Sequence, residues 1–142
     1  SNEVIDSSIF KSYDVRGIYP EPLNEHTAFN IGRAFVKQTG AQKVAIGYDA
    51  RLSGTGLFKA LAEGVISQGS DVYSIGQVPT EGIYFAVGNY DFDGGIMITA
   101  SHNPKEYNGF KMIVEKNDRM DMVMKSMILI SILSYRTYLA LC

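Results

Sequence analysis

The sequence predicts an α/β fold with three layers, α/β/α, in which helices cover both faces of a mainly parallel, mixed sheet. Short apolar runs alternate along the chain with segments whose apolar residues recur every three or four positions. That alternation is typical of βαβ units. The apolar runs are also unbroken by polar residues. Such runs are typical of strands that are buried on both faces of a sheet.

The first helix and the first strand of this pattern are predicted within residues 25–48. A helix is predicted over about 25–38, because three apolar residues fall at helical spacing: Ile31, Ala34 and Phe35. Gly40 suits the left-handed conformation that ends many helices. The apolar run within 43–48 predicts a short strand directly after that glycine.

The rest of the α/β pattern is predicted between residues 55 and 99. Two helices and two strands are expected there in alternation, over about 55–68, 71–75, 80–88 and 95–99. By contrast, the segment 12–22 is rich in turn-forming residues, so no regular element is predicted there.

The composition changes abruptly near residue 110. All 14 glycines and all 4 prolines lie at or before Gly109, whereas five of the 6 methionines lie after Lys111. This shift predicts a domain over 1–115 and a tail over 116–142 with helical character. A different domain, a truncation and a change of reading frame all remain possible origins of the tail.

Charge and composition exclude several classes of protein. The formal net charge is -2, so neither nucleic acid nor a membrane surface is an expected partner. Cys142 is the single cysteine, which excludes a disulfide framework and favours a reducing, cytoplasmic location. We expect no signal peptide. The most apolar stretch, 127–133, is shorter than the roughly 20 residues that span a bilayer.

The loop 99–104, Thr-Ala-Ser-His-Asn-Pro, is the segment that carries the chemistry. It directly follows a predicted strand, and ligands of open α/β sheets bind beyond the carboxyl ends of strands. Ser101 is therefore presented to a crevice, and Pro104 keeps the residue before it extended. Asn103 and Asn108 can orient the loop through side-chain to backbone hydrogen bonds.

A hydroxyl, an imidazole and an ammonium group are expected to converge beside this loop. Asn108-Gly109 is a tight-turn signal, and the return of the chain that it predicts brings Lys111 near Ser101. A phosphoserine carries about -1.5 to -2 charges and needs cations around it. His102, Lys111 and Arg16 are the candidates. The Gly-x-Ser-x-Gly elbow of serine hydrolases is absent, so phosphoryl transfer is the better chemical fit.

Each of these features also has a plainer interpretation. A Ser-His-Asn-Pro loop is usually just a polar turn. Asp49 and Arg51 would most often form a solvated surface pair worth about 0–1 kcal/mol. Tyr13 and Arg16 could merely cover an edge of the sheet. The run 54–56, Gly-Thr-Gly, lacks the ending of a phosphate-binding P-loop.

Three separated stretches resemble the α-D-phosphohexomutase family, the phosphomannomutase/phosphoglucomutase group. They are Phe-Lys-Ser-Tyr-Asp-Val-Arg-Gly at 10–17, Gly-Tyr-Asp-Ala-Arg at 47–51, and the loop at 99–104 together with Asn-Gly-Phe-Lys at 108–111. Their order and spacing match the family over about residues 9–112, and we expect the tail over 116–142 not to match it. The resemblance implies that this chain carries the first, catalytic-serine domain of such an enzyme.

The resemblance also implies a role for each matching residue. Ser101 is implied to be the phosphorylated serine, which exchanges its phosphoryl group with a hexose phosphate through a bound hexose bisphosphate. The reaction interconverts the 1- and 6-phosphates of mannose or glucose. The implied catalytic residues are Ser101, His102 and Lys111; the substrate-binding residues are Tyr13, Arg16, Asn103 and Asn108; and the supporting residues are Asp49 and Arg51.

The resemblance further implies Mg2+, held by the phosphate on Ser101 and by three aspartates of an Asp-x-Asp-x-Asp loop. That loop is absent from this sequence. We therefore expect an incomplete chain that is inactive as a mutase by itself. The alternative is a non-catalytic phosphosugar-binding or interaction module derived from the same domain.

Overall fold

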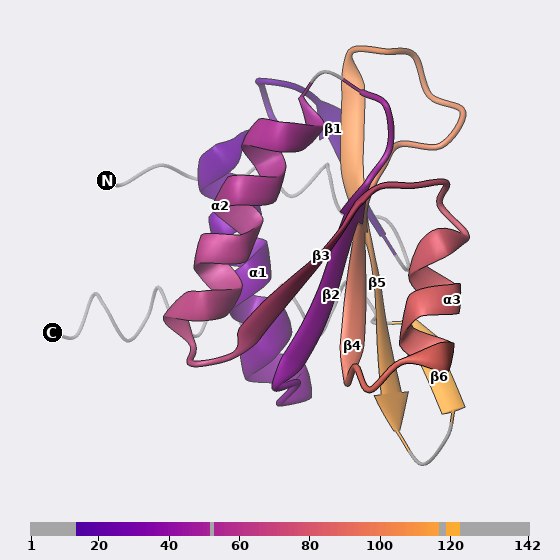
Figure 1. The fold of residues 1–142 in the computed structure, drawn as a ribbon. Coiled ribbons are helices and arrows are strands. Elements are labelled where there is room, and N and C mark those ends of the chain that lie inside the picture. The colour runs from indigo at the N-terminus through magenta and orange to yellow at the C-terminus, as the bar shows by residue number, and fades with distance from the viewer. Residues whose placement is uncertain (1–13, 52, 117–118, 123–142) are drawn as a thin grey trace, which may run out of the picture.

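A mixed sheet of six strands forms the centre of the computed structural model, which describes residues 14–51, 53–116 and 119–122 (Figure 1). The strand order is β1-β5-β4-β2-β3, and β6 also pairs with β5. The strands are β1 Asp14–Ile18, β2 Lys43–Tyr48, β3 Asp71–Gln77, β4 Gly94–Ile98, β5 Tyr107–Lys116 and β6 Arg119–Met122. β2 pairs in parallel with β3 and β4, whereas β5 pairs antiparallel with β1, β4 and β6. The sheet is therefore mixed because of one reversed strand.

Helices cover both faces of this sheet, which confirms the three-layer α/β/α prediction. α1 and α2 lie on one face and α3 lies on the other (Figure 1). Their bounds are α1 Glu25–Thr39, α2 Gly54–Ser67 and α3 Gly82–Asn89. Asn24 begins α1, because its side-chain oxygen accepts the Thr27 N–H at 3.0 Å. Gly40 ends α1 at φ 70, the left-handed conformation that the sequence predicted.

The face beneath α1 and α2 is closely packed. Gly32 of α1 lies against the Leu61 carbonyl of α2, and Gly64 of α2 lies against the Phe29 carbonyl of α1, so that a Cβ on either glycine would collide with backbone. The two helices therefore meet backbone to backbone. The side chains that fill the space below them are fully buried, among them Ile31, Phe35, Ile46, Leu57, Leu61 and Ile98.

The face beneath α3 has a smaller core. Five buried residues form it: Ala45, Ile83, Val87, Met97 and Ile113. All five residues of β4 are buried, which agrees with a strand covered on both faces. A Cβ on Gly95 would meet Ile83 and Val87 at 2.8 Å, so glycine in β4 lets α3 approach the sheet closely.

Three local predictions are wrong. The turn-rich segment 12–22 contains β1, and Asn108-Gly109 lies inside β5 rather than in a tight turn. Gly109 is instead required by strand pairing, because a Cβ there would collide with the Val15 carbonyl. In the tail expected to be helical, residues 119–122 pair with β5 as β6; the rest of the tail from residue 123 lies outside the described residues.

No helix in the part of the chain that the structure describes is both long and apolar enough to cross a membrane.

Candidate active site

Ser101 lies in the loop of residues 99–106 that joins β4 to β5, here called the Ser101 loop. Thr99 still belongs to the sheet ladder, because its N–H donates to the Gly109 carbonyl at 2.9 Å. The chain then turns sharply, and the Asn103 N–H donates to the Ala100 carbonyl at 3.0 Å. Ser101 itself has φ 51, the one positive φ of a non-glycine residue among those described. Such a backbone is uncommon and points to a site under constraint.

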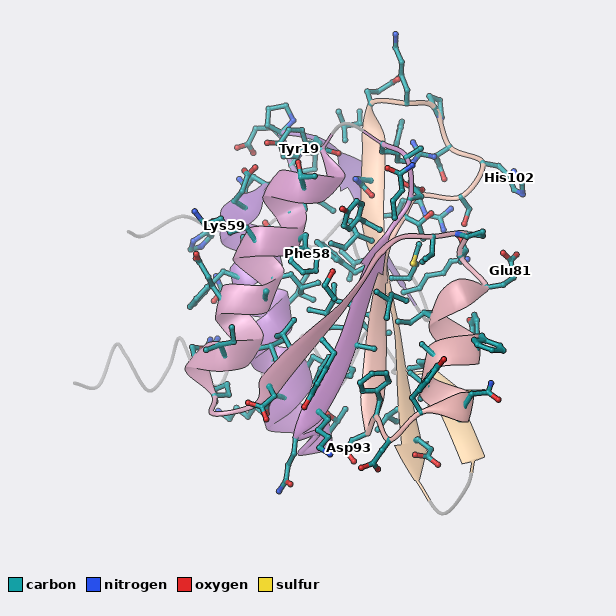
Figure 2. The ribbon with its side chains drawn as sticks, viewed as in Figure 1. Tyr19, Phe58, Lys59, Glu81, Asp93 and His102 are labelled. Carbon is teal, nitrogen blue, oxygen red and sulfur yellow. The ribbon has the colours of Figure 1, made fainter. Side chains whose placement is uncertain are left out.

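A hollow of about 520 Å³ lies in front of Ser101 and is here called the Ser101 hollow. Nine residues line it: Arg16, Asp49, Pro79, Thr80, Glu81, Thr99, Ser101, His102 and Lys111. The structure thus brings together the hydroxyl, the imidazole and the two cations that the sequence singled out. In Figure 2 the His102 and Glu81 side chains both project on the α3 side of the sheet.

Sheet register, rather than a turn, places the two cations in the Ser101 hollow. Lys111 pairs with Met97 of β4, so both side chains point to the α3 face. Arg16 pairs with Gly109, two residues before Lys111, and therefore lies on that same face. The Arg16 guanidinium also donates to the Asn103 side-chain oxygen at 2.7 Å. Both cations are partly exposed and reach the hollow from neighbouring strands.

The Arg51 side chain holds the Ser101 loop through hydrogen bonds to the loop backbone. Its side chain is only 11% exposed, so the interpretation as a solvated surface residue is wrong. The Arg51 guanidinium donates to three carbonyls of the loop, that of Pro104 at 2.6 Å and those of Ser101 and Asn103 at 2.9 Å each. It also donates to the Tyr107 carbonyl at the start of β5, at 2.9 Å. A planar guanidinium has five donors in a fixed fork. One side chain therefore fixes the shape of the loop.

Asp49 joins this arrangement to the end of β4. Its Oδ2 accepts the Thr99 hydroxyl at 2.7 Å and the Arg51 Nε at 3.3 Å. Its Oδ1 accepts the Arg51 backbone N–H at 3.1 Å. The Thr99 hydroxyl in turn accepts the Ser101 N–H at 3.0 Å. Asp49 thus lies at the meeting point of the contacts that hold Ser101.

Of the expected substrate-binding residues, Asn103 and Asn108 do not line the Ser101 hollow. Asn108 is fully buried, and its side-chain amide donates to the Ser53 hydroxyl at 2.7 Å. Asn108 therefore contributes to the scaffold and does not line the Ser101 hollow. Tyr13 lies outside the described residues.

Sequence reasoning missed three residues with polar side chains that line the Ser101 hollow: Thr80, Glu81 and Thr99. Thr99 directly follows β4, and the loop containing Thr80 and Glu81 follows β3. The rule that ligands lie beyond the carboxyl ends of strands would have drawn attention to all three.

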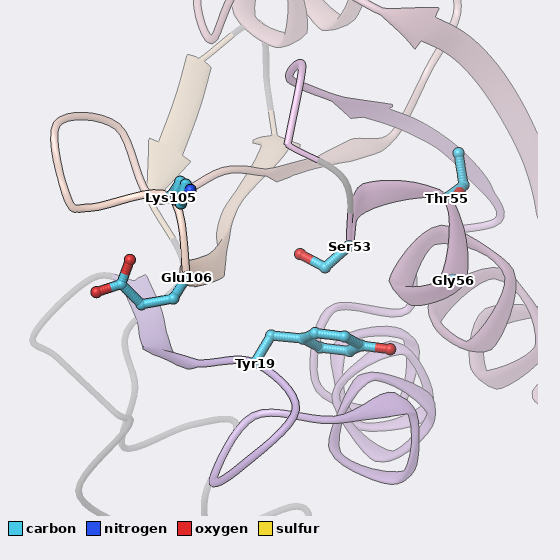
Figure 3. Close-up of a pocket in the computed structure, with 6 residues that line it drawn as sticks. All are labelled: Tyr19, Ser53, Thr55, Gly56, Lys105 and Glu106. Atoms are coloured by element: carbon cyan, nitrogen blue, oxygen red, sulfur yellow. The ribbon is translucent and has the colours of Figure 1, made fainter.

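Two other hollows lie beside the Ser101 loop, and they share Lys105 and Glu106. The larger, about 710 Å³, adjoins Asp49, Ala50, Arg51 and Asn103. The smaller, about 360 Å³, is lined also by Tyr19, Ser53, Thr55 and Gly56 (Figure 3). Beside it, the Tyr19 hydroxyl donates to the Glu25 carboxylate, which raises the pKa of Tyr19. Because Ser101 lines neither hollow, the Ser101 hollow is the candidate active site.

Within the described ranges, no group of three or more histidine, cysteine, aspartate or glutamate residues could hold a metal ion. Asp49 lines the Ser101 hollow, but its oxygens already accept hydrogen bonds from Thr99 and Arg51. Mg2+ prefers a near-octahedral set of oxygen ligands. The described residues therefore do not form a Mg2+ site by themselves.

Comparison with known proteins agrees with the motifs and the fold. The model of the phosphoglucomutase/phosphomannomutase alpha/beta/alpha domain I matches residues 7–137. The chain is 48% identical over 106 residues to a phosphomannomutase of Klebsiella pneumoniae and to one of Escherichia coli. It is 42% identical over 113 residues to a phosphomannomutase/phosphoglucomutase of Pseudomonas aeruginosa.

The chain accounts for very different shares of these relatives. The alignments cover 75% to 78% of this chain. They cover 68% of the Klebsiella protein, but only 23% and 24% of those from Escherichia and Pseudomonas. The crystal structure of a phosphoglucomutase/phosphomannomutase family protein from Burkholderia thailandensis matches with a TM-score of 0.81 at 37% identity. That match covers 94% of this chain and 31% of the Burkholderia chain.

Proposed function

This chain belongs to the phosphoglucomutase/phosphomannomutase family, and from that premise we propose that Ser101 accepts a phosphoryl group from a hexose bisphosphate and returns it to a hexose phosphate. One observation carries the proposal. Ser101 lies beyond the carboxyl end of β4, at a hollow that it shares with Arg16 and Lys111. Positioning and positive charge are what phosphoryl transfer requires of a protein.

The proposed transfer consists of one displacement and its reverse. The Ser101 Oγ attacks a phosphorus atom of the hexose bisphosphate and loses its proton. The bond from that phosphorus to the sugar oxygen breaks, and the sugar oxygen takes up a proton. In the reverse step a sugar hydroxyl attacks the phosphoserine and gives up its proton. When the 1- and 6-hydroxyls exchange these roles, the two hexose monophosphates are interconverted.

Residues in and beside the Ser101 hollow have the other roles that the proposed transfer needs. Arg16 and Lys111 stabilise the charge on the transferred phosphoryl group. His102 is exposed, and its imidazole is suited to carry the proton between sugar and serine oxygens. Asn103 does not line the hollow, and its side-chain oxygen instead orients the Arg16 guanidinium. Asp49 and Arg51 support the loop through the hydrogen bonds described above.

The whole protein's substrates and the Mg2+ of the family are part of the same proposal. Any Mg2+ that binds the serine phosphate would draw its carboxylate ligands from outside the described residues. We propose a cytoplasmic protein in which the domain predicted over 1–115 extends at least through β6, because β6 pairs with β5. The 142 residues alone would not turn over a hexose phosphate, since they span about a quarter of two of the relatives named above.

A labelling experiment tests the proposal. The purified chain is incubated with glucose 1,6-bisphosphate that carries a radioactive phosphate, and the modified residue is located by mass spectrometry. We expect a stable phosphate on Ser101 and its complete loss in Ser101→Ala. Ser74→Ala, which alters an exposed serine of β3, should label as the wild type does. Absence of label from the wild-type chain would contradict the proposal.

The same experiment separates the alternative function. Reversible binding of the bisphosphate without covalent label would support a non-catalytic phosphosugar-binding module. Turnover of glucose 1-phosphate by the chain alone would contradict the proposed inactivity of these 142 residues.

A further inference from the structure

The two peptide groups on either side of Ser101 are each held by a side chain. Its N–H donates to the Thr99 hydroxyl at 3.0 Å, and its carbonyl accepts from Arg51 at 2.9 Å. Because peptide groups are planar, the orientations of these two planes define φ and ψ of the residue between them. The direction of the Ser101 Cα–Cβ bond is thereby fixed, and χ1 alone remains to place Oγ.

The donor and the acceptor in each hydrogen bond of the Thr99 hydroxyl are also fixed. The Ser101 backbone N–H can only donate, so the Thr99 oxygen accepts from it, and the hydroxyl has a single proton to donate elsewhere. The Thr99 proton therefore goes to Asp49 Oδ2, 2.7 Å away, and a lone pair is left for the Ser101 N–H. Thr99 is 1% exposed, so water does not compete for its hydroxyl.

The hold on Ser101 is needed because its backbone is otherwise unfavourable. A φ of 51 lies in the left-handed region, where Cβ of an L-residue crowds the following carbonyl oxygen. Without the Thr99 hydroxyl, the Ser101 N–H loses its partner and the loop can relax toward the common right-handed conformation. Relaxation would move Oγ, and a misplacement of about 1 Å can slow a reaction on the order of a hundredfold.

We propose that Thr99 is a positioning residue for phosphoryl transfer. Its hydroxyl, oriented by Asp49, holds Ser101 in the left-handed backbone from which Oγ reaches the Ser101 hollow. The inference rests on the function proposed above for Ser101. It assigns to Thr99 no contact with substrate, only an action through the backbone of the residue that reacts.

Two substitutions test separately the effect of the Thr99 hydroxyl and the effect of its side-chain shape. Thr99→Val keeps the branched shape at the end of β4 and removes the hydroxyl. Thr99→Ser keeps the hydroxyl and removes the methyl group. If Thr99 served only to fill space, Thr99→Val would be the milder change. If its hydroxyl positions Ser101, Thr99→Ser would be the milder change.

The test measures the rate of Ser101 phosphorylation by glucose 1,6-bisphosphate over a range of bisphosphate concentrations. For Thr99→Val we expect a maximal rate at least tenfold below wild type, with the half-saturating concentration changed less than threefold. For Thr99→Ser we expect a maximal rate within threefold of wild type. Should Thr99→Val not fold, the comparison of Thr99→Ser with Thr99→Ala replaces it, with the same tenfold difference expected.

Amide hydrogen exchange gives an independent readout of the same contact. The Ser101 N–H should exchange at least tenfold faster in Thr99→Val than in wild type, while the Met97 and Ile98 amides of β4 keep their rates. A Thr99→Val maximal rate within threefold of wild type overturns the inference alone, as does a Thr99→Ser rate as low as that of Thr99→Val. An unlabelled wild-type chain overturns the proposed function, and the inference with it.

Discussion

The two faces of the sheet differ in how they are covered, and the candidate active site lies on the face with the smaller apolar core. Beneath α1 and α2, the helix backbones meet at Gly32 and Gly64 over the larger of the two apolar cores. Beneath α3 the apolar core is small, and the same face carries Arg16 and Lys111 near the carboxyl end of β4. The packed face supplies stability, which leaves the other face free to hold polar groups around Ser101.

The means of fixing the structure also differ between the two faces. Van der Waals contact orders α1 against α2, whereas a guanidinium and a carboxylate order the Ser101 loop through hydrogen bonds. A substitution on the packed face should therefore change mainly folding, whereas one in the Ser101 hollow or its loop should change transfer. Each prediction below tests that division.

The largest effect is expected from Gly64→Val on the packed face. The new side chain would collide with the Phe29 carbonyl of α1, and separating the two helices should lower the free energy of unfolding by more than about 3 kcal/mol. Urea denaturation followed by circular dichroism measures the change. The control is Gly40→Ala, which meets nothing within 4 Å but has φ 70; it should cost about 1–2 kcal/mol. Equal losses for the two variants would show that the helices do not meet closely.

The next largest effect is expected from Lys111→Met in the Ser101 hollow. Loss of the ammonium group should slow Ser101 phosphorylation about a hundredfold, with little change in urea denaturation. Lys105→Met is the matched control, because Lys105 lines the two neighbouring hollows and does not line the Ser101 hollow. It should label within threefold of wild type. Equal slowing by both variants would mean that general positive charge near the loop matters, rather than the position of Lys111.

The elements that the sequence predicted correctly are those defined by local pattern. The helix predicted over 25–38 is observed as α1, and the strand predicted over 43–48 is β2. β1 and β5 were missed because their identity depends on pairing with each other. The signals at Gly17 and Gly109 were taken as turns, although each glycine lies opposite a residue of the other strand.

The same distinction applies to the site. Ser101 and its loop could be identified because a polar motif follows an apolar run, which is visible in the linear sequence. The placement of Lys111 was anticipated for the wrong reason, since sheet register brings it to the hollow instead of a turn. The hydroxyl of Thr99 and the buried amide of Asn108 gain their roles only through distant partners, Asp49 and Ser53. No pattern in the local sequence indicates such contacts.

A smaller effect on transfer is expected from Arg51→Lys beneath the Ser101 loop. An ammonium group cannot reproduce the planar fork that reaches four carbonyls at once. Phosphorylation of Ser101 should slow about tenfold, and the free energy of unfolding should fall by about 1–2 kcal/mol from the lost hydrogen bonds. Labelling at the wild-type rate would show that the loop keeps its shape without the guanidinium.

The smallest effect is expected from Tyr19→Phe. It removes the hydroxyl that donates a hydrogen bond to the Glu25 carboxylate, outside the Ser101 hollow. The contact is exposed, so the free energy of unfolding should fall by less than about 1 kcal/mol near neutral pH. The contact raises the pKa of Tyr19 in the folded protein. Its stabilisation is therefore fully present below the unfolded tyrosine pKa of about 10 and is lost as pH rises through the folded pKa.

Urea denaturation of wild type and Tyr19→Phe at pH 8 and above pH 10 measures this difference directly. The gap between the two proteins should shrink at the higher pH, and the rate of Ser101 phosphorylation at pH 8 should be the same for both. A gap that widens with pH would contradict the direction of the Tyr19 pKa shift. A slower transfer in Tyr19→Phe would instead show that the region around Tyr19 and Ser53 is coupled to the Ser101 loop. The hollow lined by Tyr19 would then not be functionally separate from the Ser101 hollow.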